Sequence, residues 1–214
     1  MRDFKYSLMY VTDDTIRENK LFFDILEAAL KGGADIIQLR EKNCNTRSFY
    51  KRAVEAKKRC EIYNTPLIIN DRLDIALAIN ADGVHIGQND MPYAIARSLL
   101  GKDKIIGLSV STEKQALEAN FLDVNYIGIS PIFATKTKTK HLSTPLGIEG
   151  LKKIKLITTK RIICIGGIDI NNAENIIQNG SDGIAVISSI SRAENSKIAT
   201  EKLKNSICQT GLIK

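Results

Sequence analysis

Ile36-Ile37-Gln38-Leu39-Arg40-Glu41-Lys42 is an apolar run that passes abruptly into polar and charged residues. Similar transitions recur along the whole chain, at 67–71, 84–90, 105–109, 126–130, 162–167 and 184–189. Side chains that can bind phosphate or a metal ion therefore follow one predicted strand after another. The repetition indicates that the chemistry of this protein lies at the ends of its strands.

The apolar runs alternate with amphipathic segments, as expected of strands and helices that follow one another in turn. Strands are predicted near 8–11, 35–39, 67–70, 83–86, 105–108, 126–129, 162–165 and 183–187. Helices are predicted near 20–31, 46–62, 72–79, 92–100, 112–120, 148–157, 171–178 and 194–207. Thr46, Thr112 and Asn171 are the expected N-caps, and Pro92 suits a first helical turn.

The strands are continuous Ile-, Val- and Leu-rich runs, which is typical of a parallel sheet covered by helices. Eight strand–helix units in 214 residues predict an α/β fold, a single-domain (β/α)8 TIM barrel over residues 1–214. A doubly wound open sheet is the alternative. In an open sheet the ligand-binding groups gather at one switch point, whereas here they follow strands two to eight, as a closed ring requires.

The formal net charge of +7 comes from lysines spread over predicted helix faces and turns, without a basic arm or interleaved aromatic residues. This pattern does not favour nucleic-acid binding. A mild positive field suits small anionic substrates equally well.

No apolar stretch reaches the length of a membrane span, and no signal-peptide pattern follows the first residues, so we expect a cytoplasmic protein without a membrane partner. The four cysteines are scattered without a C-x-x-C pair, which predicts free thiols rather than a metal site. The sequence is compatible with a homo-oligomer and leaves the oligomeric state open.

Asp71 and Asp90 end the third and fourth predicted strands, so a barrel would place them side by side on one rim. Two neighbouring carboxylates repel each other unless a cation lies between them, and oxygen ligands of this kind suit Mg²⁺. Each residue taken alone is also a good helix N-cap.

The second strand presents Gln38, Arg40 and Lys42 at alternate positions, on one side of an extended segment. Cations beside a metal site indicate a polyanion, because Mg²⁺ shares its coordination with substrate phosphates and Arg and Lys bind phosphate oxygens. A diphosphate fits this set. A network of salt bridges at the barrel rim is the alternative.

The longest connection, 130–147, contains several Thr and Lys residues and is predicted to be a lid that folds over phosphate; a solvated basic loop is the alternative. A second anion site is expected at Gly166-Gly167 and Ile187-Ser188-Ser189, after strands seven and eight. Barrels often bind phosphate there through backbone N–H groups.

His85 and His141 are the two histidines of the chain, so a histidine–metal cluster or a Ser-His-Asp triad is not favoured. His85 lies within a strand and is predicted to be a hydrogen-bonded barrel residue. Ser109 has no base predicted beside it and is interpreted as a hydroxyl donor to phosphate.

Taken together, these residues resemble the thiamine-phosphate synthase family over nearly the whole chain. The matching segments are Tyr10 to Asp13, Gln38 to Lys42, Ile69 to Arg72, Ala81 to Gln88 with Asp90, Gly107 to Ser109, Pro131 to Phe133, Thr135 to Lys138 and Ile165 to Ile168. The resemblance implies an enzyme that joins the diphosphate ester of a hydroxymethyl-aminopyrimidine to hydroxyethylthiazole phosphate. The products would be thiamine monophosphate and pyrophosphate.

The resemblance also implies roles for individual residues. The metal ligands for Mg²⁺ would be Asp71 and Asp90, and the catalytic residues would be Arg40, Lys42, Ser109 and Lys138. The pyrimidine diphosphate would be held by Gln38, Arg40, Lys42, Asn70, Ser109 and Lys138. Leu39, Glu41 and Lys136 are further expected substrate-binding residues. The thiazole phosphate would contact Thr135, Thr137, Gly167, Ile187 and Ser188.

Three positions depart from the family pattern. Ser111 replaces a histidine that is common in the family, Ala134 replaces a proline, and Ser130 replaces a glycine. The related TenI-like thiazole tautomerases use a histidine that aligns at or near Ser111, so Ser111 favours the synthase. A non-catalytic barrel that binds a phosphorylated metabolite is a further alternative. An aldolase-like lyase would require a Schiff-base lysine within a strand, and none is present there.

Overall fold

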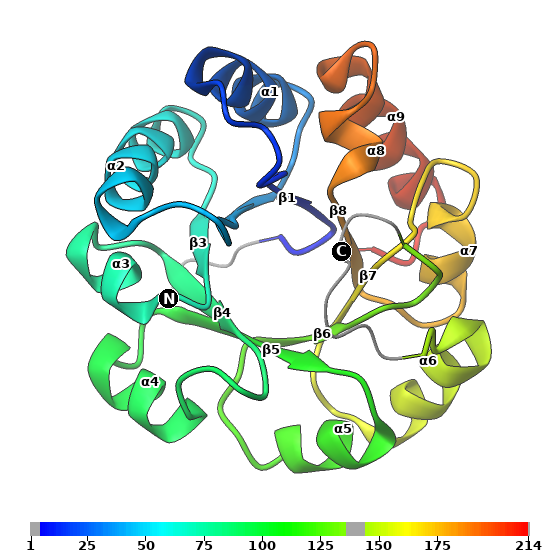
Figure 1. The fold of residues 1–214 in the computed structure, drawn as a ribbon. Helices are drawn as coiled ribbons and strands as arrows, with labels where there is room; N and C mark the ends of the chain where they lie inside the picture. The colour runs from blue at the N-terminus through cyan, green and yellow to red at the C-terminus, as the bar shows by residue number, and fades with distance from the viewer. Residues whose placement is uncertain (1–4, 136–143, 214) are drawn as a thin grey trace.

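In the computed structural model, residues 5–135 and 144–213 are described, and they form a closed barrel of parallel strands surrounded by helices (Figure 1). The strands follow one another around the ring in chain order, and β1 pairs with β8 to close it. Their bounds are β1 Leu8–Val11, β2 Ile36–Leu39, β3 Leu67–Asn70, β4 Gly83–Ile86, β5 Ile105–Val110, β6 Tyr126–Ile129, β7 Ile162–Ile165 and β8 Gly183–Val186. The TIM-barrel prediction is confirmed, and the open-sheet alternative is wrong.

The helices cover the outside of the barrel (Figure 1). Their bounds are α1 Asn19–Lys31, α2 Thr46–Ile62, α3 Leu73–Ala78, α4 Tyr93–Leu100, α5 Glu113–Ala119, α6 Gly147–Ile157, α7 Ala173–Gln178, α8 Ser188–Ser191 and α9 Ser196–Gln209. Eight of these correspond to predicted helices. The short helix α8 was not predicted, because four residues contain too little sequence to show a helical period.

Two apolar layers result from the alternation of side chains along each strand. The larger lies between the strands and the helices and includes Leu8, Ile37 and Leu39. The smaller includes Met9, Ile36, Ile68, Tyr126 and Ile163, at the alternate strand positions that point into the barrel. Nearer the carboxyl ends, several inward positions of β2 to β5 are polar, such as Gln38, Asn70 and Ser109, and these side chains line a pocket together with apolar residues of β1, β7 and β8.

Two of the three predicted N-caps are wrong by one residue. The Thr112 side chain accepts a hydrogen bond from Gln115 N at 3.2 Å and caps α5 as predicted. At α2 the cap is Asn45, which accepts from Ser48 N at 2.9 Å, so Thr46 is the first helical residue. At α7 the residue before the helix is Asn172 rather than Asn171. Asn and Thr both suit caps, so the choice between adjacent ones depends on the path of the loop.

Candidate functional site

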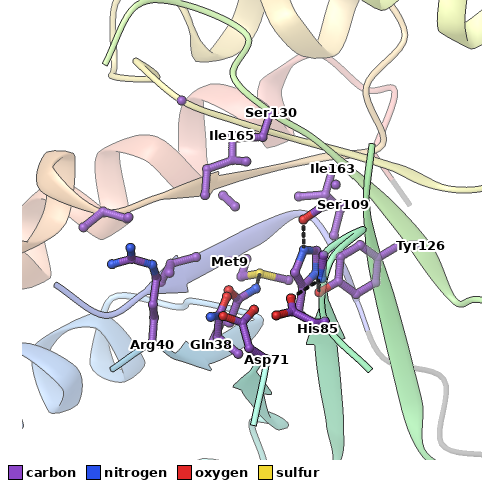
Figure 2. Close-up of a pocket in the computed structure, with 18 of the residues that line it drawn as sticks. Met9, Gln38, Arg40, Asp71, His85, Ser109, Tyr126, Ser130, Ile163 and Ile165 are labelled. Carbon is purple, nitrogen blue, oxygen red and sulfur yellow. Dashed lines mark hydrogen bonds between the residues drawn. The ribbon is translucent and has the colours of Figure 1, made fainter. Parts of the chain in front are cut away.

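A pocket opens at the carboxyl ends of the strands, where side chains from most of the barrel converge (Figure 2). Its walls include nine of the residues predicted from the sequence. These are Gln38, Arg40, Lys42, Asn70, Asp71, Asp90, Ser109, Thr135 and Ile187. Parallel strands all end on the same rim, and this is why residues far apart in the chain meet here.

Arg40 is held in place from two sides. Its backbone N–H donates to Thr12 Oγ1 at 2.9 Å, and its guanidinium Nη1 donates to Asp14 Oδ1 at 2.6 Å. The side chains of Arg40 and Asp14 are 13 % and 7 % exposed, so this ion pair is largely shielded from solvent. A guanidinium carries five donors, and one carboxylate cannot occupy them all. Arg40 can therefore keep Asp14 and still bind an anion in the pocket.

Lys42, Asp71 and Asp90 form an ionic cluster at the rim. The Lys42 ammonium pairs with Asp71 Oδ2. Asp90 Oδ2 accepts from Gly87 N at 2.7 Å. Burial raises the pKa of the Asp90 carboxyl above its usual range, and the adjacent Asp71 carboxyl raises that pKa further, against a lowering by the Gly87 N–H. The two carboxylates are thus close neighbours, as predicted from their place at the ends of adjacent strands.

Asp71 adopts a left-handed backbone conformation, with φ of 60°. Its N–H donates to the carbonyl oxygen of His85 on the next strand at 2.8 Å, which continues the β3–β4 pairing by one residue. The bond fixes the turn after β3 and directs this carboxylate toward Asp90. Asp and Asn tolerate positive φ better than most residues, so the position suits either side chain.

The floor of the pocket is made by His85, Tyr126 and Ser109 (Figure 2). The two ring nitrogens of His85 contact Tyr126 Oη and Ser109 Oγ, each at 2.9 Å. This confirms that His85 is a hydrogen-bonded barrel residue. Ser109 lies near the end of β5 and lines the pocket, as predicted. The expectation that no base lies beside it is wrong, because the His85 ring contacts its hydroxyl, a pairing across two strands that the sequence does not show.

A second recess adjoins the first at the ends of β7 and β8. It is lined by Thr135, Gly166, Gly167, Ile187 and Ser188, among others. Gly167 has φ of 64°, and a Cβ there would lie 2.6 Å from the carbonyl oxygen of Ala134. Glycine is required both by the backbone conformation and by this close approach. The short helix α8 begins in the recess, and the first N–H groups of a helix have no partners within it.

The comparisons with known proteins agree with this geometry. The sequence model described as "Thiamine monophosphate synthase" matches residues 8–190. The chain belongs to this family. The thiamine-phosphate synthase of Clostridium novyi is 45 % identical over 203 residues, which cover 95 % of this chain and 99 % of that protein. The thiamine-phosphate synthase of Methanobrevibacter smithii is also 45 % identical, covering 95 % and 96 %.

A solved structure of the thiamine phosphate pyrophosphorylase of Pyrococcus furiosus superposes with a TM-score of 0.85. It is 35 % identical in sequence, and the match covers 96 % of both chains. The likeness of this chain to the thiamine monophosphate synthase family therefore extends from sequence to the whole barrel.

In the predicted substrate-binding segment, the side chains of two residues do not face the pocket. Leu39 is fully buried among the core residues beneath the helices. Glu41 is buried on the same outer side, where its carboxylate pairs with Arg52 of α2. The strand alternation that turns Gln38, Arg40 and Lys42 inward turns these two outward. The side chains of Leu39 and Glu41 therefore face away from the pocket, and substrate binding by these two residues stays a prediction.

Four predicted or noted residues of this family member lie outside the described residues: Lys136, Thr137, Lys138 and His141. Their placement, and the prediction that 130–147 forms a lid, stay untested. Ser111 lies within the described residues, and it does not line the pocket. Its Oγ donates to Gln115 Oε1 at 3.1 Å, within the N-terminal turn of α5.

Sequence reasoning missed two polar residues that shape the site, Asp14 and Tyr126. Asp14 lies three positions after the first strand, and its partner Arg40 directly follows the second. Because these two strands are neighbours in a barrel, their positions could have indicated the Asp14–Arg40 pair. Tyr126 begins a strand and reads as an apolar residue in a run of Ile and Gly. No local pattern distinguishes a tyrosine that faces His85 from one that packs under a helix.

Proposed function

We infer that this chain catalyses the final joining of the two halves of thiamine monophosphate. It transfers the pyrimidinylmethyl group from a pyrimidine diphosphate to the ring nitrogen of hydroxyethylthiazole phosphate, and pyrophosphate is released. Family membership over residues 8–190 supports the reaction. The single structural observation that carries it is the convergence of Arg40, Lys42, Asp71 and Asp90 in one pocket.

The pyrimidine diphosphate is proposed to bind at the β2–β5 side of the pocket. Arg40 and Lys42 supply a planar fork and a point charge for the phosphate oxygens. Gln38, Asn70 and Ser109 supply amide and hydroxyl groups beside them. The predicted contacts from Lys136 and Lys138 belong to this same proposal.

Magnesium is proposed to bind between Asp71 and Asp90. The residues present fit the ion, because the neighbouring Asp71 carboxylate raises the pKa of the Asp90 carboxyl, and a divalent cation between the two would relieve their repulsion. Within 5–135 and 144–213, no group of three or more His, Cys, Asp or Glu side chains forms a metal cage. Two carboxylates suffice, since Mg²⁺ keeps waters and takes its other ligands from substrate phosphates.

The thiazole phosphate is proposed to bind in the second recess. Gly167, Ile187 and Ser188 line this recess, and we propose that their backbone N–H groups bind the phosphate, since a glycine lets the backbone approach an anion closely. Thr135 lines both recesses and lies where the two substrates would meet. Thr137 is proposed to contribute from the segment that follows.

The reaction needs no protein nucleophile. The bond between the pyrimidine methylene carbon and the diphosphate oxygen breaks, the oxygen keeps the electron pair, and the amino-substituted ring stabilises the cation left on carbon. The thiazole nitrogen then donates its lone pair to that carbon. Arg40, Lys42, Ser109 and Lys138 stabilise charge on the departing pyrophosphate, and Mg²⁺ held by Asp71 and Asp90 would supply further charge neutralisation. The pocket contributes the positioning of two substrates.

Neither alternative is supported by a specific feature of the site. A tautomerase of the TenI type would place a histidine near residue 111, whereas Ser111 hydrogen-bonds within α5. A non-catalytic binder of one phosphorylated metabolite has no need of a paired-carboxylate rim beside two separate anion recesses.

The direct test is release of pyrophosphate from both substrates together, measured by a coupled assay with and without EDTA. We expect pyrophosphate and thiamine monophosphate in equal amounts, lost with EDTA and restored with excess Mg²⁺. Binding of one phosphate compound without turnover would instead support the non-catalytic alternative.

No described helix is long and apolar enough to cross a membrane. The cytoplasmic location and any homo-oligomer stay predictions.

A further inference from the structure

Tyr126, His85 and Ser109 form a continuous line of hydrogen bonds from the interior of the barrel to the pocket. Tyr126 lies on β6, His85 on β4 and Ser109 on β5 (Figure 2). Tyr126 Oη is 2.9 Å from His85 Nδ1, and His85 Nε2 is 2.9 Å from Ser109 Oγ. The rings of His85 and Tyr126 stack with their centroids 5.5 Å apart.

Glycines make this line possible. In the strand register Gly107 pairs with both His85 and Tyr126, so it lies between their backbones. A Cβ on Gly107 would lie 2.1 Å from Tyr126 Cζ and 2.6 Å from His85 Nδ1. A Cβ on Gly128 would lie 2.9 Å from His85 Cε1. A larger residue at Gly107 would collide with both rings, and one at Gly128 would collide with the His85 ring, so this contact requires glycine at both positions.

The hydrogen bonds can run in two directions. A neutral imidazole has one donor nitrogen and one acceptor nitrogen, and a serine hydroxyl has one hydrogen. If Nε2 carries the proton, His85 donates to Ser109, and the Ser109 hydrogen is directed elsewhere. If Nδ1 carries the proton, His85 donates a hydrogen bond to Tyr126, and its Nε2 accepts the hydrogen bond of the Ser109 hydroxyl.

The surroundings of Tyr126 favour the first direction. Burial raises the pKa of the Tyr126 phenol far above its ordinary value, so the phenol keeps its hydrogen and must donate it. Among the described residues, His85 Nδ1 at 2.9 Å is the hydrogen-bond partner of the Tyr126 oxygen. The Tyr126 hydroxyl therefore donates its hydrogen to His85 Nδ1.

The pocket end of the line favours the same direction. Diphosphate oxygens accept hydrogen bonds and do not donate them, so Ser109 can bind such an oxygen only through its own hydrogen. That hydrogen is available when His85 Nε2 is the donor to Ser109 Oγ. The requirements at both ends therefore select one tautomer.

We propose that Tyr126 is a positioning residue that holds His85 as the Nε2–H tautomer, so that Ser109 keeps its hydroxyl hydrogen for a leaving-group oxygen of the substrate. This inference rests on the proposed function, because it assigns the diphosphate to the Ser109 side of the pocket. Tyr126 lines the floor of the pocket, and in this proposal its hydroxyl acts on Ser109 through His85, by the hydrogen bond to Nδ1.

The tautomer can be measured directly, because the chain has two histidines. We expect long-range ¹H–¹⁵N spectra of the ¹⁵N-histidine-labelled enzyme, with Mg²⁺ and pyrophosphate, to show His85 protonated at Nε2 alone. A His141→Asn variant assigns the signals. Protonation of His85 at Nδ1 alone, or at both nitrogens, would overturn the proposal without requiring any variant to fold.

Kinetics test whether Tyr126 acts through Ser109. Tyr126→Phe should lower kcat on the order of tenfold, with a much smaller change in KM for the pyrimidine diphosphate. In a Ser109→Ala background the same change should have little further effect, since the group through which it acts is gone. Tyr6→Phe is the control, because its ring packs 5.8 Å from that of Tyr126 but lies away from His85 and the pocket, and it should leave kcat unchanged.

Independent, multiplying effects of Tyr126→Phe and Ser109→Ala would overturn the proposal, as would an unchanged kcat in Tyr126→Phe. The proposed role of Tyr126 and the proposed function of the protein can be disproved separately. A wild-type enzyme that is active but carries the Nδ1–H tautomer contradicts the role of Tyr126 alone. A wild-type enzyme that shows the Nε2–H tautomer but releases no pyrophosphate contradicts the proposed function.

Discussion

The two recesses of this barrel are lined by different kinds of chemical group. The recess at β2–β5 contains charged side chains, with Arg40 and Lys42 in the same lining as Asp71 and Asp90. The recess at β7–β8 is lined by glycines and the start of a short helix, so backbone N–H groups would supply its donors. A site made of formal charges can neutralise a leaving group, whereas a site made of backbone dipoles can hold a phosphate that does not react. The contrast supports the proposal that the departing diphosphate binds in the first recess.

The largest expected effect comes from removing a charge in the first recess. Asp71→Asn should lower kcat by about 10²- to 10³-fold, the range seen when one stabilising group is lost from a preorganised site. Asparagine tolerates the φ of 60° at this position, so circular dichroism and thermal melting should show a folded protein. A kcat within a factor of two of wild type, at saturating Mg²⁺, would show that Asp71 has no part in catalysis.

The second largest effect is expected from a steric change in the recess at β7–β8. Gly167→Ala places a Cβ 2.6 Å from the Ala134 carbonyl oxygen and 2.8 Å from Phe133 Cβ. We expect KM for the thiazole phosphate to rise at least tenfold and the free energy of unfolding to fall by about 1–3 kcal/mol from backbone strain.

Gly211→Ala is the matched control for Gly167→Ala, because Gly211 has φ of 68° and no atom within 4 Å of its would-be Cβ. It should reproduce the strain alone and leave both KM values unchanged. Equal KM changes in the two variants would mean that strain, and not the recess, is responsible.

A smaller effect should separate the recesses by ionic strength. Raising NaCl from 0.05 to 0.5 M shortens the Debye length severalfold. KM for the pyrimidine diphosphate should therefore rise several times more than KM for the thiazole phosphate, at constant free Mg²⁺. Parallel changes in the two KM values would remove the distinction between a charged and a backbone-built site.

The smallest effect is expected at Ser111, the position that departs from the family histidine. Its hydroxyl is bonded to Gln115 Oε1 and not directed at either recess. Ser111→Ala should change kcat and both KM values by less than about twofold, as usual for a site outside the reacting groups. A larger loss in steady-state assays would show that Ser111 has taken over the function of the histidine.

The sequence predicted the barrel well because each parallel strand is buried on both faces and so appears as an unbroken apolar run. It predicted most of the pocket for a related reason, since Gln38, Arg40 and Lys42 alternate with Leu39 and Glu41 along one strand. Glu41 was nonetheless included among the substrate contacts, because its pairing with Arg52 depends on how α2 packs. Tyr126 was missed because its partner His85 lies 41 residues away in the chain.

The most direct test of the charged recess is a crystal structure of the enzyme with Mn²⁺ and pyrophosphate, using the anomalous signal of manganese. We expect one Mn²⁺ bound by Asp71 and Asp90, with pyrophosphate oxygens on Arg40, Lys42 and Ser109. Pyrophosphate bound instead at Gly167 and Ser188, or manganese far from the two carboxylates, would contradict the assignment of the leaving group to the β2–β5 side.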